Sequence, residues 1–226
     1  EQNNFIVYAP TAPGFSWSLS TDGPRYRTLI NGFATNGITA ANGTKYAVDP
    51  RRVYMYGFSN GSIFVSGYSM TYPETIAAAA PWSIASTSGS STKALPVWYG
   101  IGNQDEYYGS DDGQTYINRM KNLAGSTSSQ TINYSAFGVS NRIATTVHTG
   151  GTVEVRYSLA SDIVHGNVNE HMSNIWRDFF ARYRKKNDGS GLSELIPTAG
   201  GNEAPVANFT TMTNGLTVTF TDTSTD

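Results

Sequence analysis

The chain of 226 residues carries 15 basic and 17 acidic residues, which give a net charge of −2 at pH 7. So balanced a charge leaves no broad basic surface, and nucleic acid is therefore not an expected partner. No apolar stretch approaches the ~20 residues that a membrane-spanning helix needs, so no membrane span is expected. The chain has no cysteine, which excludes disulfide bonds and cysteine-ligated zinc.

The first residues predict a buried strand. Residues 5–8 read Phe-Ile-Val-Tyr, an apolar β-type run that Pro10 closes. Only four polar residues precede this run, with no initiator methionine and no signal peptide among them. We therefore expect the first domain, residues 1–187, to be N-terminally incomplete.

The C-terminal part of the chain predicts a linker and a second, incomplete module. Residues 188–203 are rich in Gly, Ser, Pro and Thr without a hydrophobic period, as in a linker. Residues 204–226 then alternate apolar and polar side chains around Asn214-Gly215, which predicts a β-hairpin. Because two strands alone do not make a stable domain, we expect residues 204–226 to be the start of a larger β module.

Between these ends, apolar runs typical of doubly buried strands alternate with segments of helical period. This alternation predicts an α/β fold with a mostly parallel sheet and helices on both of its faces. The expected strands are residues 53–56, 76–85 and 95–101. The expected helices are residues 25–33, 60–72 and 114–123. The run 76–85 is also compatible with a helix, because it is rich in alanine.

Capping signals delimit the later helices. Asp111 or Asp112 is the expected N-cap of the helix at 114–123, and Gly125 is its expected stop. A final helix is expected within residues 168–183, where apolar residues recur at helical spacing after a capping-box-like start at Asn167 and Glu170.

Two further features surround that final helix. The basic residues at 182 and 184–186 fall where they would complement the dipole at the helix end, so we interpret them as a helix end and not as a binding patch. Upstream, residues 143–148 and 152–157 flank Gly150-Gly151, which predicts a hairpin or a tight reversal.

The sequence Gly57-Phe58-Ser59-Asn60-Gly61 is a G-x-S-x-G motif between an expected strand and an expected helix. A nucleophile held at a sharp turn has strained backbone angles, so glycines on both sides let strand and helix approach each other. In this placement Ser59 projects above the sheet, and the Asn60 backbone N–H at the helix start faces an incipient oxyanion. The alternative interpretation is a Gly-Ser turn that only joins the two elements.

A serine hydroxyl is too weakly acidic to attack an ester unaided, so a histidine must accept its proton and a carboxylate must orient that histidine. The chain has three histidines. His165 lies in the loop between the last strand and the last helix, where the base of this architecture belongs. His171, in the first turns of that helix, is the alternative base, and His148 reads as a surface or half-buried strand residue.

Asp105 is the expected acid. It follows the strand at 95–101, on the same carboxyl edge of the sheet as Ser59. Glu106 is adjacent but is expected to point elsewhere in an extended loop, while Asp162 is close enough in sequence to pair with His165 locally. A solvated loop residue is the alternative interpretation of Asp105.

Other site chemistries are not indicated. The chain has no His-Glu-x-x-His motif, and His165 and His171 would lie on different faces of a helix. It also lacks a glycine-rich phosphate fingerprint and a Walker lysine. We therefore expect no metal and no cofactor.

Four segments of the chain together resemble the polyhydroxybutyrate-depolymerase-like esterases, secreted α/β-hydrolases related to feruloyl and acetyl xylan esterases. The segments are VDPRRVYMYGFSNGS, TYPETIAAAAPWS, LPVWYGIGNQDEYY and NIWRDFFARY. The resemblance covers most of residues 1–187 and implies Ser59 as nucleophile, Asp105 as acid and His165 as base, in an α/β-hydrolase fold without its N-terminal strands. It also implies a second oxyanion N–H, from a His-Gly loop that has no counterpart in this sequence.

Residues 204–226 resemble the opening of a polycystic-kidney-disease (PKD) type repeat, an immunoglobulin-like sandwich common beside secreted bacterial enzymes, through the words PVANF and VTFTDTST. Together the resemblances imply a secreted, bacterial serine esterase that acts on polymeric or small esters, such as polyhydroxyalkanoates or the acyl and feruloyl esters of plant polysaccharides. A peptidase or lipase on the same scaffold is one alternative, because a triad does not choose between ester and amide substrates. A non-catalytic polymer-binding protein on a degenerate hydrolase scaffold is the other.

Overall fold

The structure, a computed structural model, describes residues 6–12, 14, 16–40, 42–109, 113–166, 170–197, 209–214 and 217–222. The chain divides after Leu195 into two compact units. Within the described ranges, no helix combines the length and the apolar character of a transmembrane span.

A six-stranded sheet forms the centre of the first unit, in the order β3-β4-β5-β8-β7-β6. Its strands are β3 (Tyr54–Phe58), β4 (Ala78–Trp82), β5 (Val97–Gly102), β6 (Ser128–Ala136), β7 (Val139–Thr149) and β8 (Val155–Ala160). The first three and β8 run parallel, whereas β7 and β6 are antiparallel to their neighbours. The predicted parallel sheet is therefore confirmed, and the alanine-rich run 76–85 contributes a strand and not a helix.

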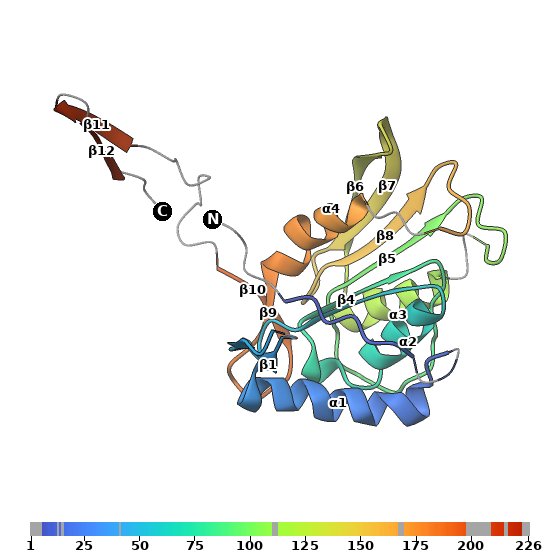
Figure 1. The fold of residues 1–226 in the computed structure, drawn as a ribbon. Coiled ribbons are helices and arrows are strands. Elements are labelled where there is room, and N and C mark those ends of the chain that lie inside the picture. Colours follow the sequence, from blue (N-terminus) through green and yellow to red (C-terminus); the bar gives the residue numbers. More distant parts are fainter. Residues whose placement is uncertain are drawn as a thin grey trace. The chain divides into compact units, whose positions relative to one another are not determined.

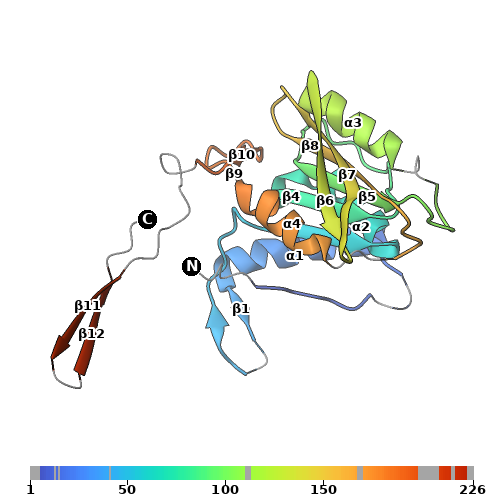
Figure 2. The same ribbon diagram turned by 90° about the horizontal axis from the view of Figure 1, so that it is seen from above.

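Helices cover both faces of this sheet (Figure 1). They are α1 (Leu19–Asn36), α2 (Asn60–Ser69), α3 (Gln114–Ala124) and α4 (His171–Asp178), with short 3-10 helices η1 (Pro73–Thr75) and η2 (Phe180–Arg182). Successive side chains of a strand point to opposite faces. Tyr99 and Ile101 accordingly pack with α1, α2 and α3, whereas Trp98 packs with Phe179 beside α4. Figure 2 shows α3 and α4 on opposite sides of the sheet.

Two short hairpins complete the first unit. Strands β1 (Ile38–Thr39) and β2 (Lys45–Tyr46) pair after α1. Strands β9 (Tyr183–Lys185) and β10 (Ser193–Leu195) pair after η2. The predicted linker at 188–203 is therefore wrong over residues 193–195, which belong to the first unit.

The N-terminal prediction is wrong over the residues that the structure describes. Residues 6–8 form no strand, and Val7 is 75% exposed. The Tyr8 ring instead meets Phe33 of α1, at 5.6 Å between centroids. An apolar run is buried as a strand only where a neighbouring strand or a core covers it, and the described residues of this run contact α1 through the Tyr8 ring instead.

Helix α1 is longer than predicted, because its start signal lies before Pro24. Ser18 is the N-cap: its backbone N–H donates to Asp22 Oδ2 at 2.9 Å, and its side chain accepts from the Thr21 N–H. The predicted start at residue 25 lies directly after Pro24, which has no backbone N–H and so removes one hydrogen bond from the helix. At α3 the predicted stop at Gly125 is confirmed by its left-handed conformation, whereas the predicted caps Asp111 and Asp112 lie outside the described residues.

The predicted final helix ends early. Helix α4 stops at Asp178. Phe179, Phe180 and Tyr183 follow at its C-cap, in η2 and in β9, and all three are buried in the same cluster. Their helical spacing therefore reflects burial and not a longer helix. The basic residues therefore do not form a helix end. Arg182 pairs with Glu154, Arg184 pairs with Glu194, and Lys185 is buried. Asn167 lies outside the described residues.

The antiparallel edge of the sheet was predicted only in part. The predicted reversal at Gly150-Gly151 is confirmed, because it joins β7 to β8. The edge strand β6 was missed, since its exposed, Ser- and Thr-rich residues show no strong apolar alternation.

The second unit contains one described hairpin. Strand β11 (Phe209–Asn214) pairs in antiparallel register with β12 (Thr217–Asp222), with Asn214 opposite Thr217. The hairpin that Asn214-Gly215 predicts is thus confirmed in its two strands.

The pairing of Trp82 with Gly100 across β4 and β5 generates a stability prediction. A Cβ atom at Gly100 would lie 2.0 Å from the Trp82 ring, which is itself fully buried. Gly100→Ala should therefore lower the free energy of unfolding by about 2 kcal/mol through overpacking, as measured by urea denaturation. Gly109→Ala is the matched control, since a Cβ there meets nothing within 4 Å. Equal stability of the two variants would contradict the packing of Trp82 over Gly100.

Candidate active site

Ser59 occupies the turn between β3 and α2. Its backbone has φ 53° and ψ −120°, a conformation that non-glycine residues rarely adopt. The Ser59 N–H donates to the Trp82 carbonyl of β4 at 3.0 Å, which fixes the turn to the neighbouring strand. The serine therefore sits at the carboxyl edge of the parallel sheet, in the strained turn that the motif predicts.

The two glycines of the motif differ in their steric role. A Cβ atom at Gly57 would lie 2.2 Å from the Gly61 carbonyl oxygen, so strand and helix can approach only because residue 57 is glycine. A Cβ atom at Gly61 would meet nothing within 4 Å. The close approach thus depends on one flanking glycine and not, as predicted, on both.

Three side chains from three strand ends meet above this turn. Ser59 follows β3, Asp105 follows β5, and His165 follows β8. His165 Nε2 lies 3.0 Å from Ser59 Oγ, and His165 Nδ1 lies 2.9 Å from Asp105 Oδ2. Serine, imidazole and carboxylate therefore form one continuous hydrogen-bonded chain, in the geometry of a nucleophile, a base and an orienting acid.

Asp105 is built to stay ionised. Its side chain is fully buried, and burial by itself raises the pKa of a carboxyl group. The bond to the His165 ring opposes burial, as do the backbone N–H groups of Tyr107 and Tyr108, which both donate to Oδ1 at 3.0 Å. These bonds prevail and hold the pKa of Asp105 below its ordinary value.

Aromatic rings surround the imidazole. Phe58 and Tyr107 lie 4.9 and 4.8 Å from the His165 ring centroid, and Tyr108 lies 5.6 Å from it. Tyr107 is 70% exposed, so one of these rings is open to solvent beside the histidine. These rings restrict the positions that the imidazole can take. Because Tyr107 is exposed, the imidazole remains close to the solvent-accessible surface.

Asn60 lies where the sequence expects it, as the first residue of α2. The N–H groups of the first helical turn have no acceptor within the helix and carry its positive dipole end, so the Asn60 N–H suits a developing oxyanion. The Asn60 side chain has a contact that the sequence did not indicate: its Oδ1 accepts the Trp17 backbone N–H at 2.8 Å. The segment before α1 is thereby fixed beside the turn.

The remaining acidic candidates have other partners. Asp162 Oδ1 accepts from Gln104 Nε2 at 3.3 Å. The prediction that Glu106 points away from the site is wrong, because the chain turns at Asp105. The Glu106 Oε2 accepts the His165 backbone N–H at 2.8 Å. Residue types alone did not specify this turn, so no signal in the sequence indicated the contact.

The alternative base, His171, is placed elsewhere. It is fully buried in a cluster with Trp98, Tyr134 and Trp82, with ring centroids 5.0 to 5.7 Å away. Ser59 already has its imidazole partner in His165, so the assignment of His171 as a base is wrong: its apolar stripe position makes it a core residue. His148 lies on β7, half-buried, opposite Val155.

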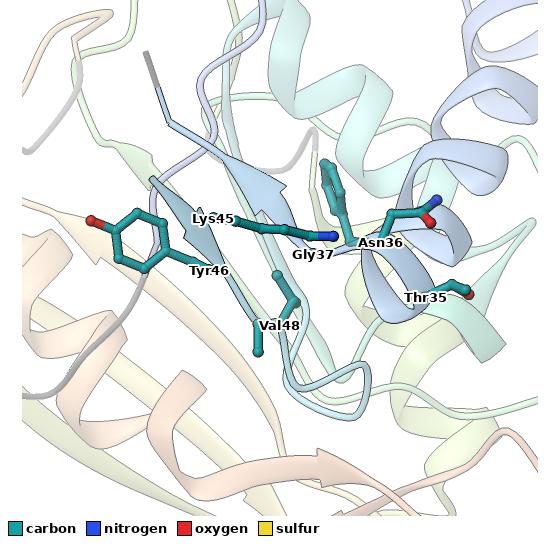
Figure 3. A pocket seen from close by; sticks show the side chains of 8 residues that line it. Thr35, Asn36, Gly37, Lys45, Tyr46 and Val48 are labelled. Carbon is teal, nitrogen blue, oxygen red and sulfur yellow. The ribbon is translucent and has the colours of Figure 1, made fainter. Parts of the chain in front are cut away.

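A surface pocket lies away from this site (Figure 3). The last residues of α1 and the β1–β2 hairpin line it, Asn36 and Lys45 among them. Helix α1 begins beside Trp17, which contacts Asn60, and its 18 residues place the pocket roughly 27 Å along the helix from that end. Among the described residues, no group of three or more acidic or histidine side chains is arranged to hold a metal ion.

Comparison with solved structures agrees with this architecture. The chain is similar to an acetyl xylan esterase from Aspergillus awamori, with a TM-score of 0.52 and 14% identity over 71% of this chain and 67% of that one. A variant of Arabidopsis thaliana SOBER1 matches with a TM-score of 0.44 and 16% identity, over 74% of this chain and 64% of that one. Esterase PE8 matches with a TM-score of 0.43 and 13% identity, over 69% and 57%.

The chain thus has the α/β-hydrolase fold, as predicted. It spans less than two thirds of the length of SOBER1 and of PE8. No protein-family model and no curated protein sequence matches it.

The buried His171 generates a prediction for acid stability. Burial and, after it, Arg156 lower the pKa of His171 to about 4, against the opposing effect of Asp178. Between the unfolded value near 6.5 and about 4, the unfolded chain binds a proton that the folded chain does not. The free energy of unfolding should therefore decrease as the pH is lowered across this window, and His171 should not change it above the window.

This contribution amounts to roughly 3 kcal/mol at 1.36 kcal/mol per pKa unit. The expected result is that His171→Phe flattens the fall in unfolding free energy between pH 7 and pH 4, as measured by urea denaturation at each pH. An unchanged slope in this variant would show that the pKa of His171 does not differ between the folded and the unfolded chain.

Proposed function

We propose that this protein is a carboxylic ester hydrolase that acts through Ser59, His165 and Asp105. One observation carries the proposal: the His165 ring bonds at once to the serine hydroxyl at 3.0 Å and to a buried carboxylate at 2.9 Å. Serine becomes an effective nucleophile only when a base accepts its proton and a third group orients that base. The strained turn that presents Ser59 and the α/β-hydrolase fold are further support.

In the proposed mechanism Ser59 Oγ attacks the ester carbonyl while His165 Nε2 accepts the hydroxyl proton. Asp105 Oδ2 accepts a hydrogen bond from the Nδ1–H of His165, which fixes the tautomer and stabilises the imidazolium. The Asn60 N–H steadies the oxyanion of the tetrahedral intermediate. His165 then returns its proton to the leaving alcohol, and water, activated by the same ring, releases the acyl group from Ser59. No cofactor takes part.

The substrate is proposed from the resemblance and from the surroundings of His165. The rings of Phe58, Tyr107 and Tyr108 suit an apolar acyl group or leaving group. Acylated plant polysaccharides and polyhydroxyalkanoates are the substrate classes that the esterase resemblance implies. We further propose that the parent protein is secreted and bacterial, and that residues 204–226 open a PKD-type module.

A peptidase or lipase of the same fold is the alternative within enzymes, because the triad alone does not select the bond to be cleaved. A panel of short p-nitrophenyl esters, long-chain esters and anilides separates these activities. Fastest turnover of the short esters is expected. A protein that binds polymer and hydrolyses none of the panel would instead be the non-catalytic alternative.

The acid assignment predicts a large loss of rate in Asp105→Asn. An amide at this position keeps the shape but holds the histidine in the wrong tautomer, so kcat on p-nitrophenyl acetate should fall by roughly a thousand-fold or more. Asp162→Asn is the matched control, since the Asp162 side chain bonds to Gln104, and not to His165, within the part of the chain that the structure describes, and it should be replaceable without loss. Ser59→Ala should abolish turnover above background. Full activity in Ser59→Ala would refute the proposed function.

A further inference from the structure

The backbone that carries His165 has few attachments. Residues 160 and 163 are held by backbone bonds, since their carbonyls accept from Asn103 at 2.8 Å and from Gln104 at 3.0 Å. Beyond them, Val164 is 54% exposed. To the rest of the described chain, the backbone of residues 164–166 makes one hydrogen bond, from the His165 N–H to Glu106 Oε2.

Two adjacent carboxylates therefore hold two parts of one histidine. Asp105 accepts from the imidazole at Nδ1, and Glu106 accepts from the backbone N–H of the same residue. Adjacent side chains of an extended chain would point in opposite directions. Here the Tyr107 and Tyr108 N–H groups close a turn on Asp105 Oδ1, and this turn directs both carboxylates to His165.

We propose that Glu106 is a positioning residue, which fixes the backbone of His165 so that the imidazole stays aligned between Ser59 and Asp105. The inference rests on the proposed function. The bond from the His165 N–H also holds the pKa of Glu106 below its ordinary value, so its carboxylate is ionised wherever the enzyme would work. A charged acceptor makes a stronger hydrogen bond than a neutral one.

The test compares Glu106→Ala and Glu106→Gln with the wild type on p-nitrophenyl acetate. Alanine removes the acceptor and frees the segment, so kcat should fall about ten-fold while KM changes by less than about two-fold, because small misalignments cost rate. Glutamine keeps a carbonyl acceptor of the same reach and should restore kcat to within about three-fold of the wild type. Hydrogen exchange of the His165 amide should be faster in Glu106→Ala.

Asp188→Ala is the matched control. Asp188 is also an exposed carboxylate that accepts one backbone N–H, that of Ser190 at 2.9 Å, in a loop outside the site. This variant should match Glu106→Ala in melting temperature and the wild type in kcat. A general loss of stability would lower the kcat of Asp188→Ala and of Glu106→Ala alike, and Glu106→Gln would not restore it.

The possible failures are distinct. A wild type that hydrolyses the ester through Ser59, with Glu106→Ala equally fast or Glu106→Gln as slow as alanine, overturns the positioning role alone. A wild type that hydrolyses no ester refutes the proposed function, and the positioning role falls with it. A ten-fold loss in alanine with rescue by glutamine supports both.

Discussion

The hydrogen bond between Ser59 and His165 joins residues 106 positions apart, and the rest of the site depends on it. The parallel sheet makes this meeting possible, because β3, β5 and β8 all end at the same edge and the loops after them share one space. The glycine at position 57 then lets α2 begin directly against β3. Sheet topology brings the groups to one edge, and the strained turn at Ser59 directs the hydroxyl toward the imidazole.

Asp105 and His171 are both buried, but only Asp105 keeps its charge. Asp105 is buried yet ionised, because three hydrogen-bonding groups oppose the cost of desolvation: its turn supplies two backbone N–H donors, and His165 supplies the ring. Burial disfavours the charge of His171 as well, and the nearby Arg156 acts in the same direction. The ring packs among aromatic side chains, and its Nδ1 lies 3.2 Å from the Asn174 side-chain nitrogen, so burial prevails and the pKa of His171 is lowered. Desolvation thus disfavours the charge in both places, and only at Asp105 do the local hydrogen bonds outweigh it.

Much of this site could be predicted from the sequence, because it follows from where the candidate residues stand relative to the predicted strands and helices. The fold brings three sequence features together at one edge of the sheet. They are the G-x-S-x-G motif after a strand, an aspartate after a later strand and a histidine before the last helix. What failed depended on tertiary contacts. Helical spacing across residues 171–183 reflected burial, and the chain leaves the helix at Asp178 to form η2 and β9. The contact of Glu106 with His165 arises from a turn that residue types alone did not specify.

The central claim is that His165 makes Ser59 nucleophilic, and covalent labelling tests it most directly. A fluorophosphonate probe reacts with an activated serine and requires no knowledge of the substrate. Peptide mapping by mass spectrometry should find the phosphonyl group on Ser59 in the native protein, and the label should be lost in His165→Gln. Labelling at another serine, or undiminished labelling of Ser59 in His165→Gln, would contradict the account.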